Sequence, residues 1–115
     1  MVESDYTQQR MFQYFLGKRF DLSIVGTMEE AIVWLDDQKP DLITSCMLLP
    51  RREGFTLLDR VKKNQETQDI PFVFVTALES EETRLKALET GAAAYITKPL
   101  ILKDLAAQLD DIIEL

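Results

Sequence analysis

Two kinds of hydrophobic pattern alternate along the chain: short apolar runs, and longer segments in which apolar residues recur every three or four positions. The short runs predict four strands, over residues 20–25, 42–46, 71–76 and 94–97. The helical spacing predicts five helices, over residues 5–18, 27–39, 54–64, 80–91 and 102–113. Because helices and strands alternate, we expect one α/β domain over residues 1–115, with a parallel sheet covered by helices on both faces.

Several of these boundaries carry a chemical signal of their own. Thr27 and Glu30 form a capping box, in which the hydroxyl and the carboxylate are expected to accept hydrogen bonds from free backbone N–H groups. Gly17 and Gly91 are placed to end the first and fourth helices. The first helix is expected to bury a single apolar stripe, formed by Met11, Phe12, Phe15 and Leu16.

The alternation is incomplete at the start of the chain. Only Met1 and Val2 precede the acidic turn Glu3-Ser4-Asp5, where a doubly wound sheet would have a full strand. We therefore expect the chain to begin at the end of a largely truncated first strand. A central position of the sheet is then thin, and stability or solubility should suffer.

Composition narrows the function classes. Apolar residues make up 46% and charged residues 29%, as in an ordinary globular domain. A single cysteine cannot form an internal disulfide, which favours a reducing, cytoplasmic setting. With one cysteine and no histidine, a structural zinc site is disfavoured. The formal net charge of −7 would repel a phosphate backbone, so we expect no nucleic-acid binding. No apolar run approaches the roughly 18 residues that span a bilayer, so we expect no membrane association.

Chemistry is expected where the strand over 42–46 ends, because ligands bind at the carboxyl ends of strands in open α/β sheets. Cys46 is the residue at that point. Pro50 and Gly54 then break the chain into a loop, which completes a pattern Cys-x-x-x-Pro-x-x-x-Gly.

A second set of landmarks ends the two following strands: Thr76-Ala77, and Lys98-Pro99 with Tyr95 three positions earlier. Together with the pattern that begins at Cys46, they resemble the receiver domain of bacterial two-component response regulators over nearly the whole chain. The resemblance implies a flavodoxin-like, doubly wound parallel five-stranded sheet in the order 2-1-3-4-5. It also implies that Thr76 and Tyr95 correspond to the family's switch pair, and Lys98 to its phosphate-contacting lysine.

The chain departs from the family at two places. Cys46 stands where the family has its phospho-accepting aspartate. The family's adjacent acidic pair, which helps to hold Mg²⁺, corresponds to Glu3 and Ser4 with Asp5 next, or to Ser4 and Asp5. Because a thiolate is a soft ligand, we expect Mg²⁺ binding to be weak or absent. Because Cys46 has no carboxylate, we expect no phosphorylation by the usual route. Lys98 should turn to Glu3, Asp5 or a backbone carbonyl, unless it persists only because Lys-Pro shapes the loop.

Three functions are compatible with this sequence. The first is a pseudo-receiver domain of phosphorelay signalling. We expect it not to be an enzyme and to bind a kinase, an output domain or a second copy of itself. Its docking face would be the helix over 80–91, the strand over 94–97 and the last helix. The second is a thiol or redox sensor in which Lys98 lowers the pKa of Cys46, although a lone buried cysteine is more often inert. The third, a small flavodoxin-like enzyme, is disfavoured because no Gly-rich phosphate loop follows the first strand.

Overall fold

The computed structural model describes residues 1–46, 54–98 and 102–114. Three parallel strands form its sheet in the order β1-β2-β3: β1 (Ile43–Ser45), β2 (Phe72–Thr76) and β3 (Ala94–Thr97). All five residues of β2 are buried, as expected of the central strand in a sheet covered on both faces.

The sheet is continued beyond β1 by single bridges. Val2 pairs in parallel with Ser45 on one side and with Val25 on the other. The spatial order is therefore the Val25 segment, Val2, β1, β2 and β3, which corresponds to the predicted order 2-1-3-4-5. The predicted strand over 20–25 is wrong as a regular element, since only Val25 pairs. A strand needs a partner along its length, and the short segment at Val2 provides one at a single position.

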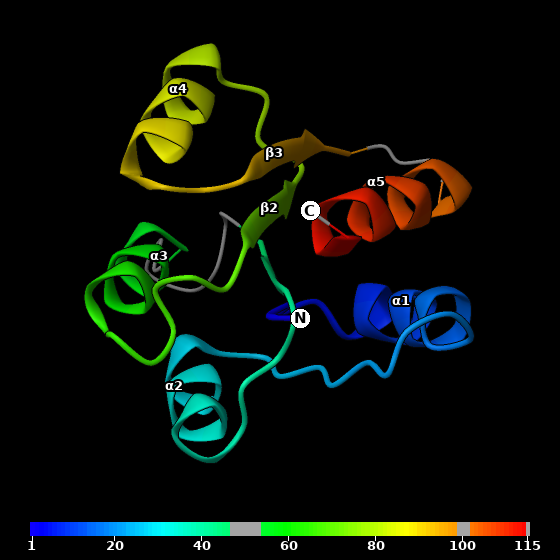
Figure 1. The fold of residues 1–115 in the computed structure, drawn as a ribbon. Coiled ribbons are helices and arrows are strands. Elements are labelled where there is room, and N and C mark those ends of the chain that lie inside the picture. Colours follow the sequence, from blue (N-terminus) through cyan, green and yellow to red (C-terminus); the bar gives the residue numbers. More distant parts are fainter. Residues whose placement is uncertain (47–53, 99–101, 115) are drawn as a thin grey trace.

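Within the described residues, five helices surround the sheet: α1 (Tyr6–Leu16), α2 (Met28–Asp37), α3 (Gly54–Lys63), α4 (Glu81–Thr90) and α5 (Leu102–Glu114). Figure 1 shows α1 and α5 side by side on one face of the sheet, with α2, α3 and α4 on the other. None of these helices is long and apolar enough to cross a bilayer.

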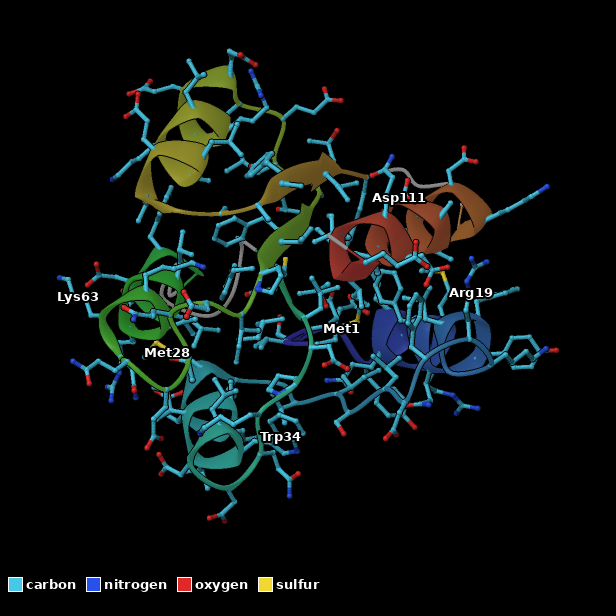
Figure 2. All side chains as sticks on the ribbon, in the orientation of Figure 1. Met1, Arg19, Met28, Trp34, Lys63 and Asp111 are labelled. Atoms are coloured by element: carbon cyan, nitrogen blue, oxygen red, sulfur yellow. The ribbon has the colours of Figure 1, made fainter. Side chains whose placement is uncertain are left out.

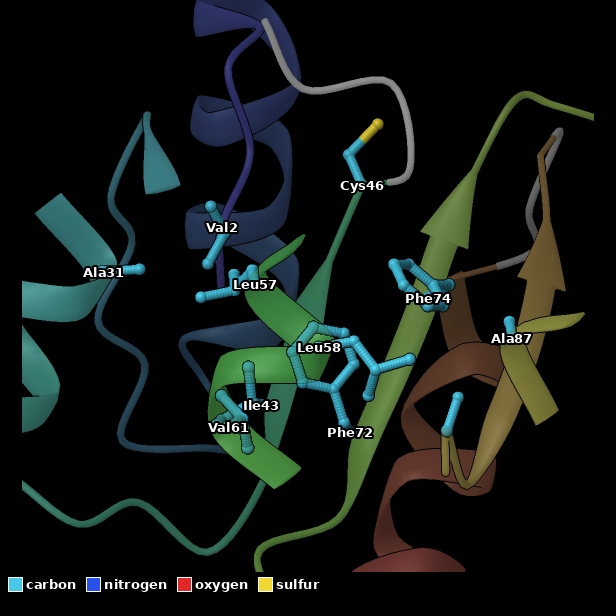
Figure 3. Packing of buried hydrophobic residues seen from close by; sticks show 11 residues of the cluster. Val2, Ala31, Ile43, Cys46, Leu57, Leu58, Val61, Phe72, Phe74 and Ala87 are labelled. Atoms are coloured by element: carbon cyan, nitrogen blue, oxygen red, sulfur yellow. The ribbon is translucent and has the colours of Figure 1, made fainter. Parts of the chain in front are cut away.

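The two faces of β2 bury separate hydrophobic clusters. Phe72 and Phe74 pack with Leu57 and Leu58 of α3 on the side of α2–α4, as Figure 3 shows. On the opposite side the alternate residues of β2 pack against α1 and α5; this cluster contains Val73, Val75, Phe12, Leu16, Leu105 and Leu109. Each fully buried side chain of this size contributes about 2 kcal/mol of transfer free energy. Because β2 supplies residues to both clusters, it is the centre of the core.

The helix boundaries have their predicted residues, with one difference at the second helix. The Glu30 N–H donates to Thr27 Oγ1 at 3.1 Å, so Thr27 caps α2 as expected. The Glu30 carboxylate, however, accepts from the Thr27 hydroxyl at 3.2 Å rather than from a backbone N–H. Gly91 ends α4 with a φ of 119°, a conformation that favours glycine, whereas Gly17 ends α1 with ordinary helical dihedrals.

The apolar stripe predicted for the first helix is only half correct. Phe12 and Leu16 are each 1% exposed, but Met11 and Phe15 are 36% and 52% exposed. Since α1 lies beside α5 at the edge of the structure, only a narrow face of the helix is covered. Figure 2 shows the side chains around the molecule; Arg19, which follows α1, forms an ion pair with Asp110 of α5.

Candidate functional site

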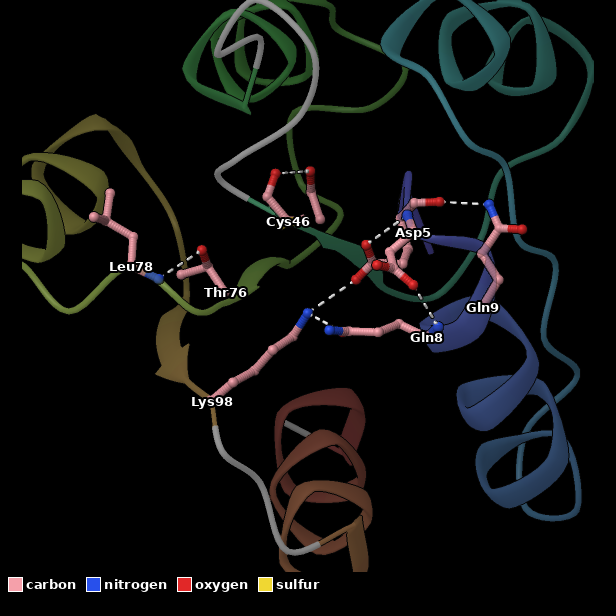
Figure 4. A network of polar contacts seen from close by, with 9 residues as sticks. Asp5, Gln8, Gln9, Cys46, Thr76, Leu78 and Lys98 are labelled. Carbon is pink, nitrogen blue, oxygen red and sulfur yellow. Dashed lines mark hydrogen bonds and ion pairs between the residues drawn. The ribbon is translucent and has the colours of Figure 1, made fainter.

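The candidate site lies at the carboxyl edge of the sheet. Cys46 directly follows β1, Thr76 is the last residue of β2, and Lys98 directly follows β3. Because the three strands are parallel, their ends open on the same edge. The Lys98 N–H donates to the Thr76 carbonyl at 2.7 Å, which joins the ends of β2 and β3. Figure 4 shows Thr76, Cys46 and Lys98 at this edge, with the Lys98 side chain directed toward α1.

Lys98 spans the site toward the start of the chain. Its Nζ lies 3.0 Å from Glu3 Oε1 and also donates to Gln8 Oε1. The lysine side chain is 13% exposed and that of the glutamate 5%, so this ion pair is largely shielded from water. The predicted contact between Lys98 and an acid is confirmed, with Glu3 as the acid. Gln8 was not among the sequence candidates, because a glutamine on a surface helix carries no motif.

Glu3 is held from several directions. Its backbone N–H donates to the Val25 carbonyl at 2.9 Å, and its own carbonyl accepts from the Gln9 side-chain amide at 2.5 Å. The second carboxylate oxygen, Oε2, accepts from the Asp5 N–H at 3.1 Å. Both oxygens of this carboxylate therefore have protein donors, which offset the cost of burying the charge.

The other two residues of the acidic turn have different surroundings. The Asp5 side chain caps α1 by accepting from the Gln8 N–H at 3.0 Å, where its negative charge also suits the positive end of the helix. Ser4 is exposed. Of the three acidic-turn candidates, Glu3 alone contacts Lys98 among the described residues.

Cys46 is a free, buried thiol with 8% exposure, at the rim of the α2–α4 cluster (Figure 3). Its N–H donates to the Val2 carbonyl at 3.0 Å, and its own carbonyl accepts from Ser45 Oγ at 3.2 Å. The backbone of Cys46 thus continues the ladder between β1 and Val2. Pro50 and Pro99, two further candidates, lie outside the described residues, while Gly54 is the buried first residue of α3.

The two residues of the predicted switch pair, Thr76 and Tyr95, both form a hydrogen bond with the backbone of Leu78. Thr76 is wholly buried, and its hydroxyl accepts from the Leu78 N–H at 3.2 Å. The Tyr95 hydroxyl donates to the Leu78 carbonyl at 2.8 Å. Burial raises the pKa of Tyr95 above its usual value of 10, and the neighbouring Cys46 raises this pKa further. Ala77, which lies between Thr76 and Leu78, is exposed.

The donor set determines which ions the site suits. Mg²⁺ prefers several oxygen ligands in octahedral geometry. In the part of the chain that the structure describes, no three acidic, cysteine or histidine side chains come together as a metal site. Glu3 is already paired with Lys98, and Asp5 caps a helix. The described residues therefore do not fit a divalent cation in this arrangement.

Comparison with known proteins identifies the family. The family model described as the response regulator receiver domain matches residues 1–110. The chain belongs to this family. Receiver domains are the signal-receiving modules of two-component systems, so the predicted family and its place in two-component signalling are confirmed.

Curated receiver-containing proteins are similar over much of this chain. The phosphate regulon transcriptional regulatory protein PhoB of Escherichia coli is 41% identical over 81 residues, which cover 70% of this chain and 35% of PhoB. The probable transcriptional regulator ycf29 of Pyropia yezoensis is 29% identical over 114 residues, which cover 98% of this chain and 51% of that protein. The receiver domain thus spans about a third to a half of these relatives.

Solved receiver structures share the fold. A response regulator from Chloroflexus aurantiacus is 27% identical with a TM-score of 0.91, covering 99% of this chain and 94% of its own. The HemR receiver domain from Leptospira biflexa is 30% identical with a TM-score of 0.82, covering 99% and 91%. The flavodoxin-like fold is confirmed, whereas the roles assigned to Cys46, Thr76, Tyr95 and Lys98 stay predictions.

Proposed function

We propose that this receiver domain is not phosphorylated by the usual aspartyl route and acts as a protein-interaction module rather than as an enzyme. The observation that carries the proposal is Cys46, which directly follows β1 where the family has its acceptor aspartate. Aspartyl phosphorylation needs a carboxylate oxygen as the nucleophile, and the thiol of Cys46 does not supply one.

Two further contacts support the proposal. The Lys98 ammonium, which in the family would meet the acceptor and then the phosphoryl oxygens, is here neutralised by Glu3 at 3.0 Å. The same contact removes Glu3 from the set of free oxygen ligands, and the Cys46 sulfur is too soft to replace it. Mg²⁺ binding at this edge should therefore be weak or absent.

The interaction face that we propose is formed by α4, β3 and α5. Tyr95 of β3 belongs to this face, and its hydroxyl is fixed by the Leu78 carbonyl at 2.8 Å. With no phosphoryl group to displace Thr76, this arrangement has no trigger, so the face should remain in one conformation. Its partner would be a kinase, an output domain or a second copy of this chain, in the cytoplasm, where a single free thiol stays reduced.

Intact-mass measurement after incubation with acetyl phosphate and Mg²⁺ tests the proposal. We expect the mass to be unchanged. A receiver domain that has aspartate at the position of Cys46, treated in the same way, should gain about 80 daltons and shows that the reagent works. A stoichiometric gain of the same size on this chain would overturn the proposal.

A thiol sensor at Cys46 is the alternative. It would need an accessible sulfur with a lowered pKa. Cys46 is 8% exposed, and the Lys98 ammonium is already paired with Glu3 at 3.0 Å. Labelling with a thiol reagent separates the two functions: the interaction module predicts slower labelling of the native protein than of the urea-unfolded chain, and the sensor predicts faster labelling.

A further inference from the structure

Helix α1 presents a group of uncovered hydrophobic side chains to solvent. Among the described residues, seven large hydrophobic side chains are exposed, and four of them belong to α1. These four are Tyr6, Met11, Tyr14 and Phe15, with exposed fractions between 36% and 69%. The helix turns Phe12 and Leu16 toward the sheet, so the exposed residues lie on its outer side and along its flank. Exposed apolar groups that cluster in this way mark an interaction surface, whereas scattered ones do not.

The same side of α1 is positively charged. The Arg10 guanidinium lies 5.8 Å from the centroid of the Tyr6 ring, and the Lys18 ammonium lies 4.1 Å from that of the Tyr14 ring. These residues are spaced four apart, so they follow one another along one side of the helix and the turn after it. Residues 6–20 contain three basic side chains and no acidic one, although the whole chain has a net charge of −7. Aromatic residues and arginine are also the types enriched at the centres of protein interfaces.

The neighbouring helix α5 has the opposite charge. It lies beside α1 on the same face of the sheet (Figure 1). Asp104, Asp111 and Glu114 are exposed on α5, together with one exposed cation, Lys103. The three acidic residues share one side of α5 with Ala107, because their positions are three or four residues apart, and this side is opposite the buried stripe of the helix. Ala107 is exposed and small, so it leaves space above the helix for an aromatic ring.

Two copies of this two-helix surface are complementary to each other. A two-fold axis that runs along the helices places α1 of each copy over α5 of the other, so the basic aromatic side meets the acidic side twice. An axis that runs across the helices would instead set α1 against α1 and α5 against α5. That arrangement brings like charges together and is unfavourable. The charges therefore select the arrangement in which the two helices exchange partners, and the occupant that they fit is a second copy of this chain.

We propose that this chain forms a two-fold homodimer through the outer sides of α1 and α5. The aromatic side chains of α1 pack around Ala107 of the second copy, and Arg10 and Lys18 face Asp111 and Glu114 of the second copy. Two helices of 11 and 13 residues give an interface at the small end of the usual range, so the dissociation constant should be on the order of 10 µM. The inference goes beyond the proposed function, whose interaction face contains α4 and not α1. The dimer leaves α4 and β3 free for another protein.

Sedimentation equilibrium on two charge-reversed variants tests the proposal. One variant combines Arg10→Glu with Lys18→Glu, and the other combines Asp111→Lys with Glu114→Lys; all four positions are exposed, so both variants should fold. Either variant alone places like charges in both contacts of the dimer, and we expect its self-association to weaken at least about tenfold. An equimolar mixture has opposite charges in both contacts. It should form a heterodimer with an affinity close to that of the unmodified homodimer.

Two exposed hydrophobic residues provide a matched pair of further variants. Phe15→Ser on α1, where Phe15 is 52% exposed, should weaken the dimer about tenfold, whereas Leu85→Ser on α4, where Leu85 is 48% exposed, should leave it unchanged. Three results overturn the proposal: an unmodified chain that stays monomeric well above the expected dissociation constant, a mixture that associates no more tightly than the separate variants, or a dimer that Leu85→Ser dissociates and Phe15→Ser does not. If a charge-reversed variant does not fold, the comparison of Phe15→Ser with Leu85→Ser decides. None of these results bears on phosphorylation at Cys46, which the mass measurement tests separately.

Discussion

The Lys98 ammonium lies 3.0 Å from Oε1 of Glu3, although 95 positions separate the two residues in the sequence. Glu3 follows Val2, which is bridged to Ser45 of β1, and Lys98 follows β3, so the ion pair crosses the carboxyl edge over β1 and β2. The contact fastens the beginning of the chain to its last strand. It also sets the charge of the candidate site, because the cation and the carboxylate neutralise each other.

Removing one member of this pair should be strongly destabilising. Lys98→Met leaves the Glu3 carboxylate buried without its cation, and we expect the free energy of unfolding to fall by about 3 kcal/mol. Adding Glu3→Gln to this variant should recover most of the loss. Urea denaturation of the two single variants and the double variant gives the coupling energy.

An exposed ion pair provides the matched control. Lys63 lies 2.9 Å from Asp59, with side chains 75% and 49% exposed. Lys63→Met should change the free energy of unfolding by less than about 1 kcal/mol, since water screens this contact. Equal losses for Lys63→Met and Lys98→Met would show that burial adds nothing to the Lys98–Glu3 contact.

Cys46→Asp should create a phosphorylatable site. The substitution places a carboxylate at the end of β1, which supplies the nucleophile and adds an oxygen ligand close to the acidic turn. We expect Cys46→Asp to gain about 80 daltons with acetyl phosphate and Mg²⁺, while Cys46→Asn, of the same shape but uncharged, gains nothing. A folded Cys46→Asp protein without an adduct would mean that Ser4 has also removed an essential ligand.

The Tyr95 hydroxyl should make the free energy of unfolding depend on pH in alkaline solution. Burial raises the pKa of Tyr95, so the folded protein favours the neutral phenol. The stabilisation is therefore complete below pH 10 and is lost as the pH rises beyond the ordinary tyrosine pKa. Tyr95→Phe should lack this alkaline loss. At neutral pH the same variant should lose about 1 kcal/mol, because the bond to the Leu78 carbonyl is gone.

Urea denaturation at several pH values measures both effects on Tyr95. Tyr14→Phe is the control, since Tyr14 is 61% exposed. A Tyr95→Phe protein with the same alkaline loss as the unmodified chain would assign that loss to another group.

The amino terminus predicts a pH dependence near neutrality. Burial lowers the pKa of the Met1 ammonium from 8.0 to about 6. The unfolded chain thus binds a proton in a range where the folded chain does not, so stability is full above pH 8 and falls as the pH drops to 6. Because Ser23, whose carbonyl accepts from the Met1 ammonium, is an exposed residue, we expect a loss of about 1–2 kcal/mol rather than the full value of two pKa units.

Acetylation of the amino group isolates this effect. The acetylated chain keeps an N–H for the Ser23 carbonyl but cannot be protonated. Its free energy of unfolding should stay level between pH 8 and 6, and the chain has no histidine to add a slope of its own. An identical slope with and without the acetyl group would contradict the lowered pKa.

The sequence predicts the fold better than it predicts the individual contacts of the site. Strand and helix order follow from local patterns, and the ends of β2 and β3 follow from Thr76 and Lys98. The exposure of Phe15 was not predictable, because periodicity shows which residues share a face but not how much of that face a neighbour covers. Gln8 was missed for a related reason, since its contact with Lys98 depends on how α1 sits against the sheet.

Because Val2 pairs only through single bridges, its segment should resist local unfolding less than β2 does. β2 is paired along both edges and packed on both faces, so its amide hydrogens should exchange with solvent only when the whole domain unfolds. Val2 and Val25 are held by single bridges, and they should exchange through smaller, more frequent openings. Glu3 is joined to Val2, so each such opening also separates the carboxylate from Lys98 and briefly exposes the cation at the carboxyl edge.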